Sequence, residues 1–160
     1  MKRLWAPWRL EYIKGEKDAE CFLCRGIARE QDREDLIVRR GRLCGVIMNR
    51  YPYNNGHLMV FPYRHVHDMC ETTPEEQAEM MTLMNACIAV LRRLLNPEGI
   101  NVGINLGKAA GAGLEEHVHM HIVPRWVGDT NFMAVMDDTK VIPQALDELW
   151  MALREAMDAL

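Results

Sequence analysis

The chain has 160 residues, of which 49% are hydrophobic, and a net charge of −4 at pH 7. This length and apolar content suit a single domain over residues 1–160, while the negative charge and the lack of a Lys/Arg run exclude a general surface for nucleic acid polymers. No apolar run is long enough to cross a bilayer and the first residues lead into a polar segment, so we expect a cytoplasmic protein that does not bind membranes.

Residues 1–20 form an aromatic N-terminal extension. Trp5, Trp8 and Tyr12 follow one another closely in the sequence, and Pro7 prevents a regular helix through them. We expect this extension to cover an apolar patch or contact a partner chain rather than to contact a ligand base.

Cys21 and Cys24 have the Cys-x-x-Cys spacing of a zinc knuckle, which needs two further ligands. The spacing leaves His65, His67 and His117 as candidates, and two reduced cysteines without metal are the alternative. The chain has five cysteines, an odd number that argues against a disulfide framework. We expect the remaining three to be small core residues, namely Cys44, Cys70 and Cys87.

Residues 25–35 are charged and compatible with a helix. Apolar runs over residues 35–40, 43–49 and 57–62 then predict three strands of a meander. The turn-forming residues 51–56 join the second strand to the third. Asn49 and His57 therefore flank one hairpin.

Thr73, Pro74 and Glu76 predict the start of a helix, with an N-cap, a proline at the first position and a capping box. Apolar residues at three- and four-residue spacing carry this helix to about Leu95. Residues 100–105 then alternate as a strand that ends at Asn105.

The loop from Asn105 to Gly113 consists mostly of small residues, whose backbone N–H groups can approach an anion closely. It leads into the strand predicted over residues 117–125, where His117, His119 and His121 alternate with Val118, Met120 and Ile122. Alternation points the three imidazoles to one face and the apolar side chains to the other. Imidazoles beside such a loop indicate phosphate chemistry, with metal binding as the competing interpretation.

Residues 126–160 are predicted to form a surface loop followed by a C-terminal helix. The helix, from Gln144 to Leu160, carries apolar residues at helical spacing and should pack at the edge of the domain or at a dimer interface.

The segment His117–Val123 resembles the motif of the histidine triad (HIT) family of nucleotide hydrolases and transferases. Asn49, Gly56-His57 and Asn105-x-Gly107 follow the family pattern in the same order. The aromatic extension resembles that of the bacterial branch of diadenosine tetraphosphate phosphorylases. The resemblance implies a HIT-like α+β fold, an antiparallel sheet of about five strands with one long helix and a C-terminal helix, and a homodimer.

The resemblance also assigns roles to residues. His119 would be the nucleophile that forms a nucleotidyl-histidine intermediate, His121 would stabilise the phosphate charge, and His57 would border the site. Asn49 would contact the ribose. The phosphate would be bound by Asn105 and by backbone N–H groups of three loop residues, Gly111, Ala112 and Gly113.

Some members of the family carry a structural zinc ion, and the resemblance places the ligands at Cys21, Cys24, His65 and His117, one zinc per chain. No organic cofactor is expected. The segment Leu114-Glu115-Glu116 departs from the family, where many members have a glutamine and a Ser or Thr, and this leaves the leaving-group preference open.

The expected function is cleavage at the α-phosphate of adenine dinucleoside polyphosphates, such as diadenosine tetraphosphate, with water or inorganic phosphate as the acceptor. Two alternatives remain open. One is hydrolysis of purine nucleoside phosphoramidates, and the other is a zinc-stabilised nucleotide-binding module without turnover.

Overall fold

The computed structural model describes residues 21–129 and 144–160. The predicted N-terminal extension, and the part of the predicted loop from residue 130 to residue 143, lie outside the described residues. Within the described residues, no helix is both long enough and apolar enough to cross a membrane.

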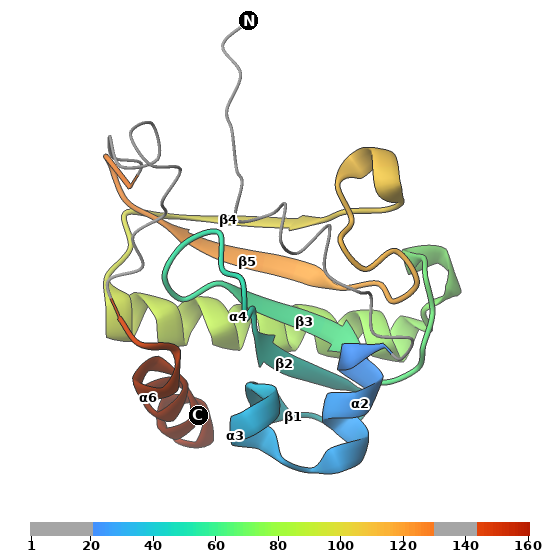
Figure 1. The fold of residues 1–160 in the computed structure, drawn as a ribbon, viewed down its shortest axis with the longest axis horizontal. Coiled ribbons are helices and arrows are strands. Elements are labelled where there is room, and N and C mark those ends of the chain that lie inside the picture. The colour runs from blue at the N-terminus through green and yellow to red at the C-terminus, as the bar shows by residue number, and fades with distance from the viewer. Residues whose placement is uncertain (1–20, 130–143) are drawn as a thin grey trace, which may run out of the picture.

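Five antiparallel strands form one sheet in the order β1-β2-β3-β5-β4 (Figure 1). The strands are β1 (Ile37–Arg40), β2 (Cys44–Met48), β3 (Leu58–Pro62), β4 (Gly99–Ile104) and β5 (Met120–Arg125). The first three form the predicted meander. The predicted α+β class, with its five-stranded sheet, is confirmed.

The long helix α4 (Pro74–Leu95) packs against β2, β3 and β5 and crosses one face of the sheet (Figure 1). The capping box forms as predicted: Thr73 accepts from the Glu76 backbone N–H, and the Glu76 carboxylate accepts from Thr73 N–H. Asn96 ends the helix in a left-handed conformation.

The C-terminal helix α6 (Leu146–Asp158) packs against β1 and α4 of the same chain, at the edge of the domain. Leu149, Leu153 and Met157 are fully buried there, and Trp150 Nε1 donates to the backbone oxygen of Ile37 over 2.9 Å. The apolar spacing of the sequence therefore corresponds to an intramolecular contact.

Two short helices, α2 (Phe22–Arg29) and α3 (Asp32–Asp35), precede the sheet. Leu36 follows α3 in a left-handed conformation, so the first strand starts at Ile37 and not at Asp35. In the part of the chain that the structure describes, the two remaining elements are 3₁₀ turns, η1 (Met69–Glu71) and η2 (Lys108–Ala110). Cys44 and Cys87 are buried as predicted, but the prediction for Cys70 is wrong, because η1 leaves its thiol exposed.

Candidate active site and metal centre

The three alternating histidines lie at the start of β5, but only His121 belongs to the sheet ladder. The strand was predicted from residue 117 and begins at Met120. The carbonyl groups that a longer ladder would use are taken by imidazoles: Pro62 accepts from His117 Nε2, and the His117 carbonyl accepts from His119 Nδ1, both over 2.8 Å. The backbone before the strand bonds instead to the loop after β3, where Val118 N–H donates to Val66.

The apolar residues of the motif are buried as predicted. Val118, Met120 and Ile122 are at most 6% exposed. The imidazoles are also buried, although they lie on the other side of the chain: His117, His119 and His121 are at most 9% exposed. His119 and His121 share a face, with ring centroids 4.8 Å apart. His117 instead lies beside Cys21 and Cys24, at the N-terminus of α2.

The hydrogen bond of His119 fixes its tautomer. A carbonyl oxygen only accepts, so Nδ1 of His119 carries the proton that it donates to His117, and Nε2 keeps its lone pair. Burial lowers the pKa of His119, although the same hydrogen bond works against that shift. A neutral imidazole with the lone pair on Nε2 is the form that can attack an electrophilic phosphorus.

A second chain of hydrogen bonds fixes the proton of His121. The backbone N–H of Tyr53 donates to Nδ1 of His57 over 3.1 Å, so the proton of neutral His57 lies on Nε2. That Nε2 is 2.9 Å from Nδ1 of His121 and donates to it. Neutral His121 therefore carries its own proton on Nε2 and can donate it to an anion.

His57 is held neutral by its surroundings. Its side chain is 1% exposed, and burial, followed by the neighbouring His121 and His119, lowers its pKa to about 3. Tyr53 covers both rings, with its centroid 4.6 Å from that of His57 and 5.6 Å from that of His121. His57, predicted as a catalytic residue at the border of the site, thus orients His121 directly.

Asn49 lies on the other side of His57. Its amide nitrogen donates to His57 Nδ1 over 3.3 Å, and its amide oxygen accepts from Tyr51 N–H over 2.9 Å. The hairpin from β2 to β3 therefore brings Asn49 and His57 together as the sequence predicts. They lie next to His119 and His121, the histidine pair.

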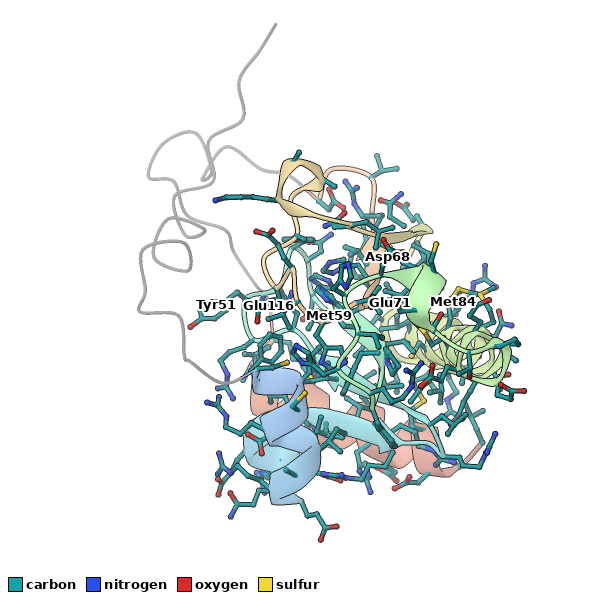
Figure 2. All side chains as sticks on the ribbon, turned by 90° about the vertical axis from the view of Figure 1, so that its right-hand side faces the viewer. Tyr51, Met59, Asp68, Glu71, Met84 and Glu116 are labelled. Carbon is teal, nitrogen blue, oxygen red and sulfur yellow. The ribbon has the colours of Figure 1, made fainter. Side chains whose placement is uncertain are left out.

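The small-residue loop has part of its backbone already bonded. Gly111 N–H donates to Lys108, and Ala112 N–H donates to Gly107. Asn105, at the start of the loop, lines a cavity with His121. Gly111, Ala112 and Gly113 do not line that cavity. A second cavity beside the loop has an acidic wall of Asp68, Glu115 and Glu116, and Figure 2 looks onto this end of the molecule.

The four predicted metal ligands meet at one point. The ligand atoms of Cys21, Cys24, His65 and His117 all lie within 4.8 Å of one another. Nδ1 of His117 is 3.3 Å from the Cys21 sulfur and 3.5 Å from that of Cys24, and Nδ1 of His65 is 3.3 Å from the Cys24 sulfur. Tetrahedral zinc with ordinary Zn–S and Zn–N bonds would separate S and N by about 3.5 Å, so the group fits the ion.

His117 is prepared for this role by its tautomer. Because Nε2 donates to the Pro62 carbonyl, Nδ1 keeps the lone pair and points at both cysteines. Burial lowers the pKa of His117 to about 4, with His65 and His119 adding to the shift and the Pro62 hydrogen bond opposing it. A neutral imidazole with an outer carbonyl partner is the usual form of a histidine ligand.

Several residues beside this site were not predicted from the sequence. Tyr53 orients His57. Arg125, at the end of β5, forms an ion pair with Asp129. Asn54 donates to Asp129, and Asn101 accepts from Arg125. Arg125 lies four residues after His121 on the same face of β5, so the alternation that identified the histidines could have pointed to it.

Comparison with known proteins gives consistent matches. A family model described as HIT domain matches residues 30–127. Over 154 residues the chain is 42% identical to AP-4-A phosphorylase of Mycobacterium tuberculosis, covering 91% of this chain and 79% of that protein.

Two solved structures are also similar. One is a hypothetical histidine triad nucleotide-binding protein of Sulfolobus tokodaii, with a TM-score of 0.70, 25% identity and coverage of 88% of this chain and 93% of the other. The second is a Zn-bound histidine triad family protein of Mycobacterium smegmatis, with a TM-score of 0.68, 26% identity and coverage of 88% and 94%.

Proposed function

The chain belongs to the HIT domain family, and from that premise we propose that it is an enzyme that cleaves adenine dinucleoside polyphosphates at an α-phosphate. The observation that carries this proposal is the hydrogen bond from His119 Nδ1 to the His117 carbonyl, because it leaves a neutral imidazole with its lone pair on Nε2. The similarity to AP-4-A phosphorylase favours diadenosine tetraphosphate as substrate and inorganic phosphate as acceptor.

In the first step, Nε2 of His119 attacks the α-phosphorus. A P–N bond forms while the P–O bond to the leaving polyphosphate breaks, and the proton on Nδ1 remains shared with the His117 carbonyl. With diadenosine tetraphosphate the leaving group is ATP, and AMP stays on His119. The Nε2–H of His121, set by the hydrogen bond from His57, stabilises the charge on the phosphate oxygens.

In the second step, an oxygen of inorganic phosphate attacks the same phosphorus. The P–N bond breaks and ADP leaves, so the products are ADP and ATP. Asn49, beside His57, is placed to contact the ribose of the nucleotide held on His119. Asn105 and the N–H of Gly113 are the remaining candidates for phosphate contacts, since the Gly111 and Ala112 N–H groups already donate within the loop.

We further propose that the cluster of Cys21, Cys24, His65 and His117 holds one structural zinc ion. Four protein ligands leave no open position, so zinc would tie α2 to the loops around the site and leave His119 to the chemistry. The Zn-bound relative supports the identity of the metal. Thiolate ligands also need reduced cysteines, which supports a cytoplasmic location.

A homodimer is part of the same proposal. Within the described residues β4 is an edge strand that pairs only with β5, and Val102 on it is 44% exposed. An open edge of this kind can pair with a second copy of the chain. We propose that residues 1–160 form one domain of such a dimer.

The decisive experiment is turnover of diadenosine tetraphosphate with and without inorganic phosphate, with the products separated by chromatography. We expect phosphate-dependent ADP and ATP, no turnover by His119→Ala, and normal turnover by His67→Ala, which removes an exposed histidine outside the site. AMP and ATP formed without phosphate would identify water as the acceptor. If diadenosine tetraphosphate is not cleaved but adenosine phosphoramidate is hydrolysed, the first alternative replaces the proposal. If nucleotides bind without any turnover, the second alternative replaces it.

A further inference from the structure

A cavity of about 380 Å³ lies on the histidine face of the sheet, over β4 and β5. It begins at His121 and Asn105 and continues along the strands past Gly103, Val123 and Asn101 to Arg125. Alternate residues of a strand are about 6.7 Å apart, so the run from His121 to Arg125 covers about 13 Å. The proposed chemistry uses only the end of this cavity that contains His121.

Strand register separates most of this cavity from the predicted ribose contact across the sheet. His121 pairs with Met59 of β3 on one side and with Gly103 of β4 on the other. Asn49 follows β2, which lies beyond β3. His121 thus has Asn49 on the β2 side and β4 on the other side, where most of the cavity lies, although Tyr53 and Asn54 of the turn between β2 and β3 also line it. A substrate with its α-phosphate at His119 and its ribose at Asn49 would extend its other end into the cavity.

The cavity does not offer a free positive charge. Arg125 binds both carboxylate oxygens of Asp129, over 2.6 and 3.1 Å, and donates its remaining terminal nitrogen to Asn101 over 2.9 Å. The Arg125 guanidinium lowers the pKa of Asp129 to about 2, so the pair stays ionised and neutral overall. Asn54 also donates to Asp129, over 2.8 Å. A site walled in this way suits an uncharged group better than a phosphate.

The shape of the cavity also suits a flat group. A side chain at Gly103 would meet no atom within 4 Å, so the floor beside His121 is open because the residue is glycine. Val123 supplies an apolar surface, and the amides of Asn101 and Asn105 supply polar groups at the two ends. The volume is at the small end of the range of about 300–1,000 Å³ for ligand pockets, which fits one nucleoside rather than a dinucleotide.

We infer that this cavity binds the second nucleoside of the dinucleoside polyphosphate, the one that departs with the leaving group. The inference rests on the proposed function, and it makes the β4 side of the site the part that distinguishes dinucleotides from mononucleotides. Gly103 is then a specificity residue, because any larger residue would fill the space for the nucleoside.

The test compares two substrates that share the phosphate chain, diadenosine tetraphosphate and adenosine tetraphosphate, which lacks the second nucleoside. The measured quantity is the ratio of their kcat/KM values. We expect the wild-type protein to favour the dinucleotide at least tenfold, and Gly103→Val to reduce that ratio at least tenfold. Gly99→Val is the matched control, since it lies on the same strand outside the cavity and its Cβ would meet only the Arg125 Cβ, at 3.9 Å.

A second variant, Asn101→Phe, fills the cavity two residues farther from His121 and should reduce the ratio without adjoining the histidine pair. Unchanged ratios in both variants would overturn the inference, as would an equal loss for both substrates or a wild-type protein that cleaves both equally well. A wild-type protein that cleaves neither compound would instead remove the proposed function, and this inference with it.

Discussion

His57 donates a hydrogen bond from Nε2 to Nδ1 of His121 over 2.9 Å, between two buried imidazoles. The direction of this bond follows from the Tyr53 N–H that occupies the other nitrogen of His57. It leaves His121 with its proton on Nε2, where a bound phosphate can accept it. The proton position of His121 is therefore set from outside the triad, whereas that of His119 is set by the His117 carbonyl within it.

The first prediction is that His57→Phe lowers kcat for diadenosine tetraphosphate by roughly 100-fold. Without the donor, Nδ1 of His121 can take up the proton itself, and a histidine in the wrong tautomer can cost several orders of magnitude in an enzyme. His57→Gln keeps an N–H donor and should retain more activity than His57→Phe. Steady-state kinetics of the two variants checks this, and equal losses would contradict a role through the hydrogen bond.

A second prediction concerns stability in acid. The pKa of His57 is about 3 in the folded protein and about 6.5 in the unfolded chain, so between these values the unfolded chain binds more protons. The contribution of His57 is present in full above pH 6.5 and is lost as pH falls toward 3. Between pH 7 and pH 5 the free energy of unfolding should drop by about 2 kcal/mol on this account.

Urea unfolding at the two pH values, with a metal chelator present throughout, measures this drop. The reference is His57→Phe, which removes the titrating group and should show a pH dependence smaller by about the same 2 kcal/mol. A pH dependence identical in the two proteins would show that His57 titrates normally.

A third prediction tests the metal. Protein purified without added zinc should contain about one equivalent per chain, and Cys24→Ser should contain less than about a tenth, because three ligands hold zinc much more weakly than four. Cys70→Ser is the control, since that cysteine is exposed and lies outside the cluster. The proposal of zinc fails if wild-type protein is metal-free and Cys21→Ser and Cys24→Ser unfold at the wild-type temperature.

Sequence reasoning reached the features that depend on residues close together in the chain. The capping box at Thr73 and Glu76, the hairpin between Asn49 and His57, and the shared face of His119 and His121 follow from local spacing, and the structure contains them. The third histidine, His117, departs from that face and lies beside the cysteines. The metal ligands are far apart, and spacing alone left His67 as an alternative to His65. The family resemblance selected His65, which the structure places in the cluster.

What the sequence could not supply depends on contacts between distant segments. The ladder between β3 and β5 stops at Met120, where Pro62 has no N–H to continue it and Val118 N–H donates to Val66 instead, and propensity does not report such distant pairing. The cavity along β4 and β5 exists because β5 pairs between β3 and β4, an order that no local pattern specifies. Cys70 was misplaced because the sequence does not show which side chains of η1 face the solvent.

The last prediction concerns Glu76, which links the start of α4 to the loop that carries His65. Its side chain is 3% exposed and accepts from Thr73 N–H and from Arg64 over 2.8 and 2.6 Å. Glu76→Ala would remove the capping box and leave Arg64 without this partner, although Arg64 is half exposed and can turn to water. We therefore expect a loss of about 2 kcal/mol, less than for a fully buried ion pair. Urea unfolding should show this loss for Glu76→Ala. The control is Glu75→Ala, an exposed neighbour in the same turn, which should change the free energy of unfolding by less than about 0.5 kcal/mol. Similar losses for the two variants would contradict the role of Glu76.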